Sequence, residues 1–203
     1  LRDGAQSEGI SFSVQDKLNI VKALDDFGVH YIEAGNPGSN PKDIEFFEKV
    51  KKLKLKNATL CAFGSTRRKG IKVEDDSNVI SLLEADTPTV VIFGKSWDLH
   101  IKEILRATEE ENLEMIYDTI SFFKEKGKEV IFDAEHFFDG YKANKKCTMK
   151  IIDKAVHAGA DVIVLCDTNG AILPTEAYSI TKEVVDKYPE KRIGIHCHND
   201  IDC

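Results

Sequence analysis

The sequence of 203 residues lacks the features that mark several special classes of protein. No apolar run approaches the roughly 18 residues that a membrane-spanning helix needs, so we expect no transmembrane segment. The chain has 28 Lys and Arg against 35 Asp and Glu, a formal net charge of −7. The excess of basic residues typical of nucleic-acid-binding proteins is therefore missing. We expect this protein to bind neither a nucleic acid nor a membrane surface.

Paired cysteines are also missing. The number of cysteines, five, is odd, and no two of them have the Cys-x-x-Cys spacing. This pattern counts against a disulfide scaffold and against a structural zinc knuckle. We expect reduced thiols in a cytoplasmic protein. The chain begins at Leu1 rather than at Met, so we expect residues to precede it in the full protein.

Glycine-rich phosphate-binding loops are absent as well. Gly94-Lys95-Ser96 resembles the end of a P-loop, but Thr89 occupies the position five residues earlier where such a loop needs a glycine. Gly35-Asn-Pro-Gly38 does not have the spacing of a dinucleotide-binding G-x-G-x-x-G loop. These differences count against a P-loop protein and against a Rossmann-type dehydrogenase.

The sequence does contain a regular alternation of β-rich runs and helical patterns. Ser13–Asp16 and Thr108–Glu111 have the pattern of helix capping boxes, and Gly28 and Gly127 mark helix ends. Six runs have the composition and length of buried parallel strands: His30–Gly35, Ala58–Phe63, Thr89–Phe93, Glu129–Glu135, Asp161–Asp167 and Arg192–His198. Their spacing is that of repeated strand–helix units.

Strictly alternating units of this kind form either a doubly wound sheet or a (β/α)8 barrel. Acidic residues and histidines lie at the C-terminal ends of several runs, which is where barrel enzymes assemble their active sites. We therefore predict an α/β fold of the (β/α)8 TIM-barrel class. A complete barrel has eight strands and about 250 residues. We expect residues 1–203 to be one partial barrel domain that lacks most of strand one, ending at Leu1-Arg2, and all of strand eight.

The strongest chemical signal is His196-Cys197-His198 at the end of the last predicted strand. Side chains two residues apart face the same side of a strand, with Cα atoms about 6.5–7 Å apart. The two imidazoles are either satisfied polar groups or metal ligands. Asp3 favours metal binding, because strands one and seven lie close together in a barrel. Two histidines and a carboxylate suit a divalent ion that also binds substrate.

Two other groups allow more than one interpretation. Asp133 and Glu135 share a strand face, either as an acid–base pair or as a hydrogen-bonded structural pair. The basic cluster Arg67-Arg68-Lys69 follows another predicted strand. It is either a solvated loop or a contact for an anionic substrate or a phosphate of CoA.

Three motifs resemble a known enzyme family. Leu1-Arg-Asp-Gly-Ala-Gln6, Asp167-Thr-Asn-Gly170 and His196-Cys-His-Asn-Asp200 are similar to motifs of the metal-dependent Claisen-condensing barrels. That family includes 2-isopropylmalate synthase, homocitrate synthase, citramalate synthase and hydroxymethylglutaryl-CoA (HMG-CoA) lyase. The segments that look most like the citramalate synthase branch are Gly35–Asp43, Gly64–Arg68 and Phe132–Tyr141. The resemblance runs over essentially the whole chain.

The resemblance implies an acyltransferase that condenses acetyl-CoA with pyruvate to (R)-citramalate and CoA, on the threonine-independent route to isoleucine. It implies that Asp3, His196 and His198 bind a divalent ion, for which magnesium, manganese, zinc and cobalt all fit. It further implies C-terminal domains and an Asn metal ligand beyond Cys203, and a homodimer when the protein is full length. After His-Asn-Asp the family usually has a small residue and Gly, whereas Ile201-Asp202 stand here.

The resemblance also assigns the substrate-binding residues. Arg2 and Glu135 are the implied catalytic residues, with Arg2 stabilising the developing oxyanion and Gln6 beside it. Glu135 and Thr168 are implied to line the keto-acid pocket, with Thr168 reaching the carboxylate of the keto acid. No residue is implied as the base that removes a methyl proton from acetyl-CoA.

Three alternatives stay open. One is a 2-isopropylmalate synthase that uses 2-oxoisovalerate in leucine biosynthesis. Another is the reverse chemistry, an HMG-CoA-lyase-like cleavage of a hydroxyacyl-CoA. The third is a non-enzymatic barrel that binds a metal or a metabolite. Arg2 beside three predicted metal ligands counts against the third, because storing an ion needs no such cation.

Overall fold

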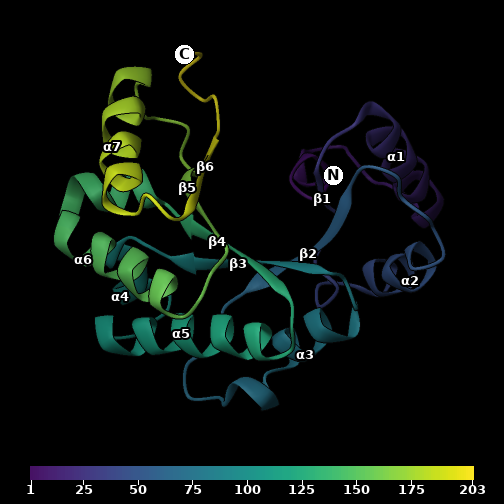
Figure 1. Ribbon diagram of the computed structural model, residues 1–203, viewed down its shortest axis with the longest axis horizontal. Coiled ribbons are helices and arrows are strands. Elements are labelled where there is room, and N and C mark those ends of the chain that lie inside the picture. The colour runs from purple at the N-terminus through teal and green to yellow at the C-terminus, as the bar shows by residue number, and fades with distance from the viewer.

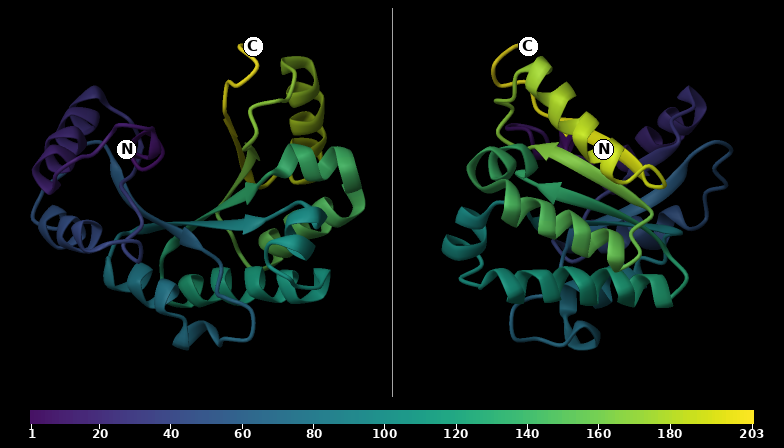
Figure 2. Two further views of the ribbon diagram at one scale, coloured as in Figure 1. Left: turned by 180° about the vertical axis from the view of Figure 1, so that it is seen from behind. Right: turned by 60° about the vertical axis from the view of Figure 1, so that its left-hand side comes forward.

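The computed structural model describes residues 1–203 and contains one sheet of six parallel strands. The strands follow one another across the sheet in chain order: β1 (Tyr31–Glu33), β2 (Thr59–Ser65), β3 (Thr89–Lys95), β4 (Glu129–Glu135), β5 (Val162–Asp167) and β6 (Arg192–Cys197). Each is paired in parallel with its neighbours in the chain. The sheet curls through part of a barrel, with the helices on its outer side (Figures 1 and 2). This arrangement confirms the predicted barrel class.

Helices connect successive strands, as the alternation predicts. The α-helices are α1 (Val14–Phe27), α2 (Pro41–Val50), α3 (Ser77–Glu84), α4 (Asp98–Glu103), α5 (Glu109–Glu125), α6 (Phe137–His157) and α7 (Pro174–Lys187). Two short 3-10 helices, η1 (Gly4–Gln6) and η2 (Val73–Asp75), lie in loops. None of the helices is both long enough and apolar enough to cross a membrane.

The two predicted capping boxes are present. The Ser13 hydroxyl accepts a hydrogen bond from the Asp16 amide at 3.1 Å, and the Asp16 carboxylate accepts one from the Ser13 amide at 2.9 Å. Thr108 and Glu111 make the same pair of bonds at the start of α5. Gly28 ends α1 with a φ of 92°, the left-handed conformation that glycine adopts without steric strain.

The alternation of side chains along the strands separates two apolar regions. Outward residues such as Ile92, Phe132 and Leu165 belong to the large core between the sheet and the helices. Inward residues near the start of the strands, Cys61, Val91 and Ile131, form a smaller cluster inside the curl. Farther along β4 and β6 the inward positions are polar, at Asp133, Glu135 and His196. The C-terminal ends of the strands therefore present polar side chains above an apolar floor.

The N-terminal segment differs from its prediction. Leu1-Arg2 forms no strand, and the Arg2 amide donates a backbone hydrogen bond to the Glu33 carbonyl at 2.9 Å. The chain turns directly into η1 after this contact. The bond to β1 nevertheless anchors Arg2 and Asp3 at the C-terminal edge of the sheet.

Candidate metal and substrate site

A cavity of about 340 Å³ lies at the C-terminal ends of the strands. All seven residues that the sequence predicts for metal or substrate binding line it. They come from the segment around η1 and from the ends of β4, β5 and β6, and the curl of the sheet brings these elements together. The cavity is thus the candidate active site.

The predicted metal ligands converge. Oδ2 of Asp3 lies 4.0 Å from Nε2 of His196, and Oδ1 of Asp3 lies 4.0 Å from Nε2 of His198. One donor atom from each of the three side chains lies within 4.8 Å of the others. Metal bonds of about 2.0–2.2 Å place donors on one ion a little closer than this, so small side-chain rotations suffice. Two imidazoles and a carboxylate fit a divalent cation with open coordination positions.

The loop after β5 explains the Asp167-Thr-Asn-Gly170 motif. The buried Asp167 carboxylate accepts hydrogen bonds from the amides of Ala171 and Ile172, and the Asp167 carbonyl accepts one from the His198 amide at 3.2 Å. Gly170 has a φ of 63°, and a Cβ there would lie 2.8 Å from the Asp200 nitrogen. Only glycine lets this loop pack against the end of β6. The loop therefore holds His198 in place.

Arg2 is fixed from several sides. Its Nε donates to Oε1 of Glu33 at 2.6 Å, and its Nη1 donates to Oε1 of Gln6 at 3.0 Å. The guanidinium carbon lies 3.8 Å from the centroid of the Phe63 ring. The side chain is only 13% exposed. These contacts hold a permanent positive charge beside Asp3 and at the wall of the cavity.

Thr168 and Glu135 are also held by protein contacts. The Thr168 hydroxyl oxygen accepts a hydrogen bond from the His136 amide at 2.9 Å. Its own hydrogen therefore stays available to donate into the cavity. The Glu135 carboxylate forms an ion pair with Lys95, which lies directly opposite it in the register of β3 and β4. Lys95 is a contact that the sequence analysis missed.

Four further residues line the cavity beyond the seven predicted for metal or substrate binding. Phe63 and Phe93 stack with ring centroids 5.1 Å apart and form an aromatic wall. Asp133 and Cys166 lie deeper. Burial, with the nearby Glu33 carboxylate, raises the pKa of Asp133 to about 7. The sequence analysis identifies Asp133 as a partner of Glu135 on one strand face. The inward period-two positions of β2, β3 and β5 are the sequence signal that would have found the other three residues.

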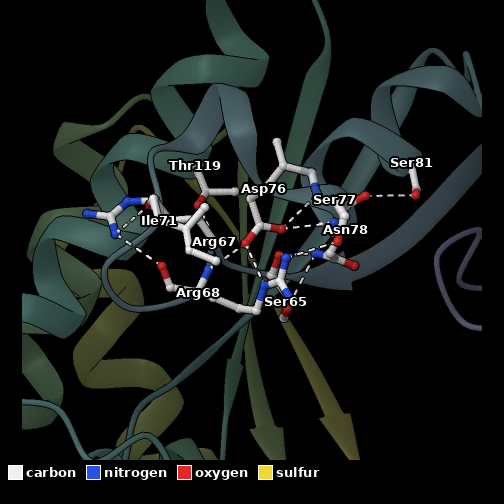
Figure 3. Close-up of polar contacts among 10 residues, drawn as sticks. Ser65, Arg67, Arg68, Ile71, Asp76, Ser77, Asn78, Ser81 and Thr119 are labelled. Atoms are coloured by element: carbon white, nitrogen blue, oxygen red, sulfur yellow. Dashed lines mark hydrogen bonds and ion pairs between the residues drawn. The ribbon is translucent and has the colours of Figure 1, made fainter.

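The basic cluster after β2 does not line the cavity. Figure 3 shows the polar contacts that its arginines make instead. Arg67 Nε donates to Asp118 at 2.8 Å, and the Arg67 amide donates to the Thr119 hydroxyl at 2.9 Å. Arg68 donates through its amide and its Nε to Asp76. These bonds tie the loop to α3 and α5. The arginines thus have a structural role here, and the alternative of an anion contact gains no support.

The buried Asp76 at the start of α3 leads to a stability prediction. Burial alone would raise the pKa of this carboxyl, but hydrogen bonds from Arg68, Val79 and Asn78 outweigh it and hold the pKa below its usual value. Because Arg68 is mostly exposed, the ion pair contributes little. The bonds from backbone amides contribute most, so we expect Asp76→Ala to lower the free energy of unfolding by about 2–4 kcal/mol.

Chemical denaturation at several pH values would measure this loss, with exposed Asp75→Ala as the matched control. A depressed folded-state pKa means that the contribution is complete above about pH 4 and disappears as the pH falls through that lower pKa. The difference between Asp76→Ala and the unsubstituted protein should shrink accordingly. Equal stability of the two variants at neutral pH would contradict the prediction.

Comparison with known proteins identifies the family. A family model described as HMGL-like matches residues 1–203. The chain belongs to the HMGL-like family. It is 57% identical to (R)-citramalate synthase of Aquifex aeolicus over 98% of its own length, and 51% identical to that of Geobacter sulfurreducens over 100%. Homocitrate synthase of Sulfurisphaera tokodaii is 35% identical over 99%.

The chain spans less than half the length of the curated relatives that it matches. It spans 38% of the two citramalate synthases and 42% of the homocitrate synthase. Among solved structures, an HMG-CoA lyase of Bacillus subtilis superposes with a TM-score of 0.77 at 18% identity, covering 97% of this chain and 65% of that one. An HMG-CoA lyase of Pseudomonas aeruginosa gives a TM-score of 0.76 at 20% identity. These likenesses support the barrel fold.

Proposed function

We propose that this chain forms the condensing site of an acyltransferase that joins acetyl-CoA to pyruvate, giving (R)-citramalate and CoA on a route to isoleucine. The observation that carries the proposal is the convergence of Asp3, His196 and His198 with Arg2 in one cavity. The choice of pyruvate is supported by five (R)-citramalate synthases that are 47–57% identical to this chain.

The reaction forms one carbon–carbon bond and releases one thiol. The methyl carbon of acetyl-CoA, after losing a proton, attacks C2 of pyruvate, and the electron pair of the carbonyl moves to its oxygen. Water then cleaves the thioester, and CoA leaves as the free thiol. A divalent ion held by Asp3, His196 and His198 would polarise the keto group as a Lewis acid.

The protein side chains are suited to the other demands of this reaction. Arg2 is already oriented by Glu33 and Gln6, and it would supply positive charge where negative charge develops on the keto oxygen. The Thr168 hydroxyl can donate to the carboxylate of the keto acid. Both groups are positioned before substrate binds, so little reorganisation is needed during the reaction.

The aromatic wall supports a small keto acid. Phe63 lies below the Arg2 guanidinium, Phe93 stacks on Phe63, and both rings line the cavity on that side. The methyl group of pyruvate is smaller than the branched side chain of 2-oxoisovalerate or the carboxyethyl group of 2-oxoglutarate. Bulky rings at these positions favour the smallest of the three substrates by exclusion.

The test uses the full-length protein that contains this chain. Thiol release from acetyl-CoA would be measured with Mg²⁺ or Mn²⁺ and with pyruvate, 2-oxoisovalerate and 2-oxoglutarate in parallel, with a chelator as the control. We expect release to be fastest with pyruvate and to stop with the chelator. Faster release with 2-oxoisovalerate would favour the 2-isopropylmalate synthase alternative. Cleavage of a hydroxyacyl-CoA without any condensation would favour a lyase. Metal binding without turnover of any substrate would favour a binding protein.

A further inference from the structure

A second set of metal-binding side chains lies deeper in the barrel than the first. One donor atom each from Asp133, Cys166 and His196 lies within 4.8 Å of the others. Asp133 and Cys166 are each only 6% exposed, whereas the side chains of Asp3 and His198 are 45% and 38% exposed. The two sets share His196, and both line the same cavity.

Strand register explains why these three side chains meet. Cys166 on β5 is the direct partner of His196 on β6, so the two side chains point inward at the same level. Asp133 on β4 is the partner of Val164, which lies two residues before Cys166 on the same face of β5. Three adjacent rigid strands therefore supply one oxygen, one sulfur and one nitrogen donor.

The Asp133 carboxylate gives an independent indication of a cation. Asp133 is only 6% exposed and borders the cavity, and its carboxylate makes none of the hydrogen bonds found in the structure. A buried carboxylate without a hydrogen-bond partner is costly unless a cation or a proton neutralises it. Glu33, Arg2 and Glu135 are the charged groups near Asp133, so two negative charges stand against one positive charge.

The Cys166 thiol likewise makes no strong hydrogen bond. Its only hydrogen-bond contact is a weak one of 3.8 Å from Sγ to the Val164 carbonyl oxygen, on its own strand. Burial raises the pKa of this thiol, so without a metal it stays protonated. A cation that bonds strongly to sulfur can still displace the proton.

We propose that Asp133, Cys166 and His196 form a second metal position that selects thiophilic divalent cations such as Zn²⁺ and Cd²⁺. Carboxylate oxygen, thiolate sulfur and imidazole nitrogen are all zinc ligands, whereas Mg²⁺ and Mn²⁺ prefer oxygen donors. On binding, the S–H bond of Cys166 breaks, the proton passes to solvent, and the sulfur bonds to the metal. No electron transfer is involved.

Because His196 belongs to both sets, the inner and outer positions exclude each other. If the proposed function holds, a thiophilic ion at the inner position removes a ligand from the outer one. Zn²⁺ or Cd²⁺ would then inhibit turnover supported by Mg²⁺ or Mn²⁺. This consequence rests on the proposed function, whereas the binding site itself does not.

The test measures Cd²⁺ binding directly, through the near-ultraviolet charge-transfer absorption of a thiolate–cadmium bond. Metal-free full-length protein carrying Cys197→Ser and Cys203→Ser is titrated with Cd²⁺ alone, since these two thiols are exposed. We expect an absorption band that persists in Asp3→Asn. In Cys166→Ser we expect the band to disappear or the affinity to fall at least about tenfold.

The matched control is Cys61→Ser, which removes another buried thiol from the inward face of the sheet and should leave the band unchanged. Circular dichroism would verify folding, and Cys166→Ala offers a second variant should the serine destabilise the interior. A band that survives both Cys166 substitutions, or one that is lost equally in Asp3→Asn, would overturn the proposal. An intact band in a protein that releases no thiol with any keto acid would overturn only the proposed function.

Discussion

Arg2→Lys is expected to lower kcat for the condensation by about 10²–10³-fold while leaving the amount of bound metal unchanged. The guanidinium donates to Glu33 and Gln6 at the same time and stacks over Phe63. A lysine ammonium is a single flexible point charge that cannot reproduce this geometry. Removing one preorganised donor from a site where charge develops in the transition state typically reduces kcat by this factor.

Steady-state kinetics with pyruvate and metal analysis of the purified protein would measure the two effects separately. Arg106→Lys is the matched control, because Arg106 is exposed and does not line the cavity. A kcat close to that of the unsubstituted protein would show that Arg2 has no part in stabilising the transition state.

Asp3→Asn is expected to weaken metal binding by more than about 100-fold and to abolish condensation at micromolar metal concentrations. Loss of a residue that only supports a metal ligand already reduces affinity by about 10–100-fold, and Asp3 is proposed as a direct ligand. Asparagine keeps the size of the side chain but removes its negative charge. The remaining His196 and His198 offer only neutral donors.

Metal affinity from a titration with Mn²⁺, together with thiol release at rising metal concentration, would measure this change. Asp26→Asn is the control, since Asp26 is an exposed residue of α1. Full activity of Asp3→Asn at low metal concentration would exclude Asp3 as a ligand.

The fold could be predicted because its determinants are local. The capping boxes at Ser13 and Thr108 and the β-rich runs lie within short stretches of sequence. The predictions ended β2 and β3 two residues early, at Phe63 and Phe93, before glycines that resemble strand ends. In the structure Gly64 and Gly94 lie within the strands. Glycine is required there by close packing, because a Cβ would lie 2.7 Å from the Leu82 side chain at Gly64 and 2.8 Å from the Phe132 ring at Gly94.

The site could be predicted only in part. The spacing of His196 and His198 alone predicts that the two side chains share one face of a strand. Cys166 and Asp133, in contrast, lie near His196 only because of the register of three neighbouring strands. Lys95 illustrates the same limit. Its position after Gly94 suggests a P-loop in the sequence, but the β3–β4 register places it opposite Glu135, with which it forms an ion pair. Contacts between strands follow from register, which a single sequence does not specify.

The most direct test of the proposed metal centre is a crystal structure of the full-length protein grown with Mn²⁺ and pyruvate, in which anomalous scattering locates the ion. We expect the Mn²⁺ peak between the Asp3 carboxylate and the imidazoles of His196 and His198, with pyruvate beside Arg2 and Thr168. An ion bound elsewhere, with Asp3, His196 and His198 free of metal, would contradict the proposed centre and the chemistry derived from it.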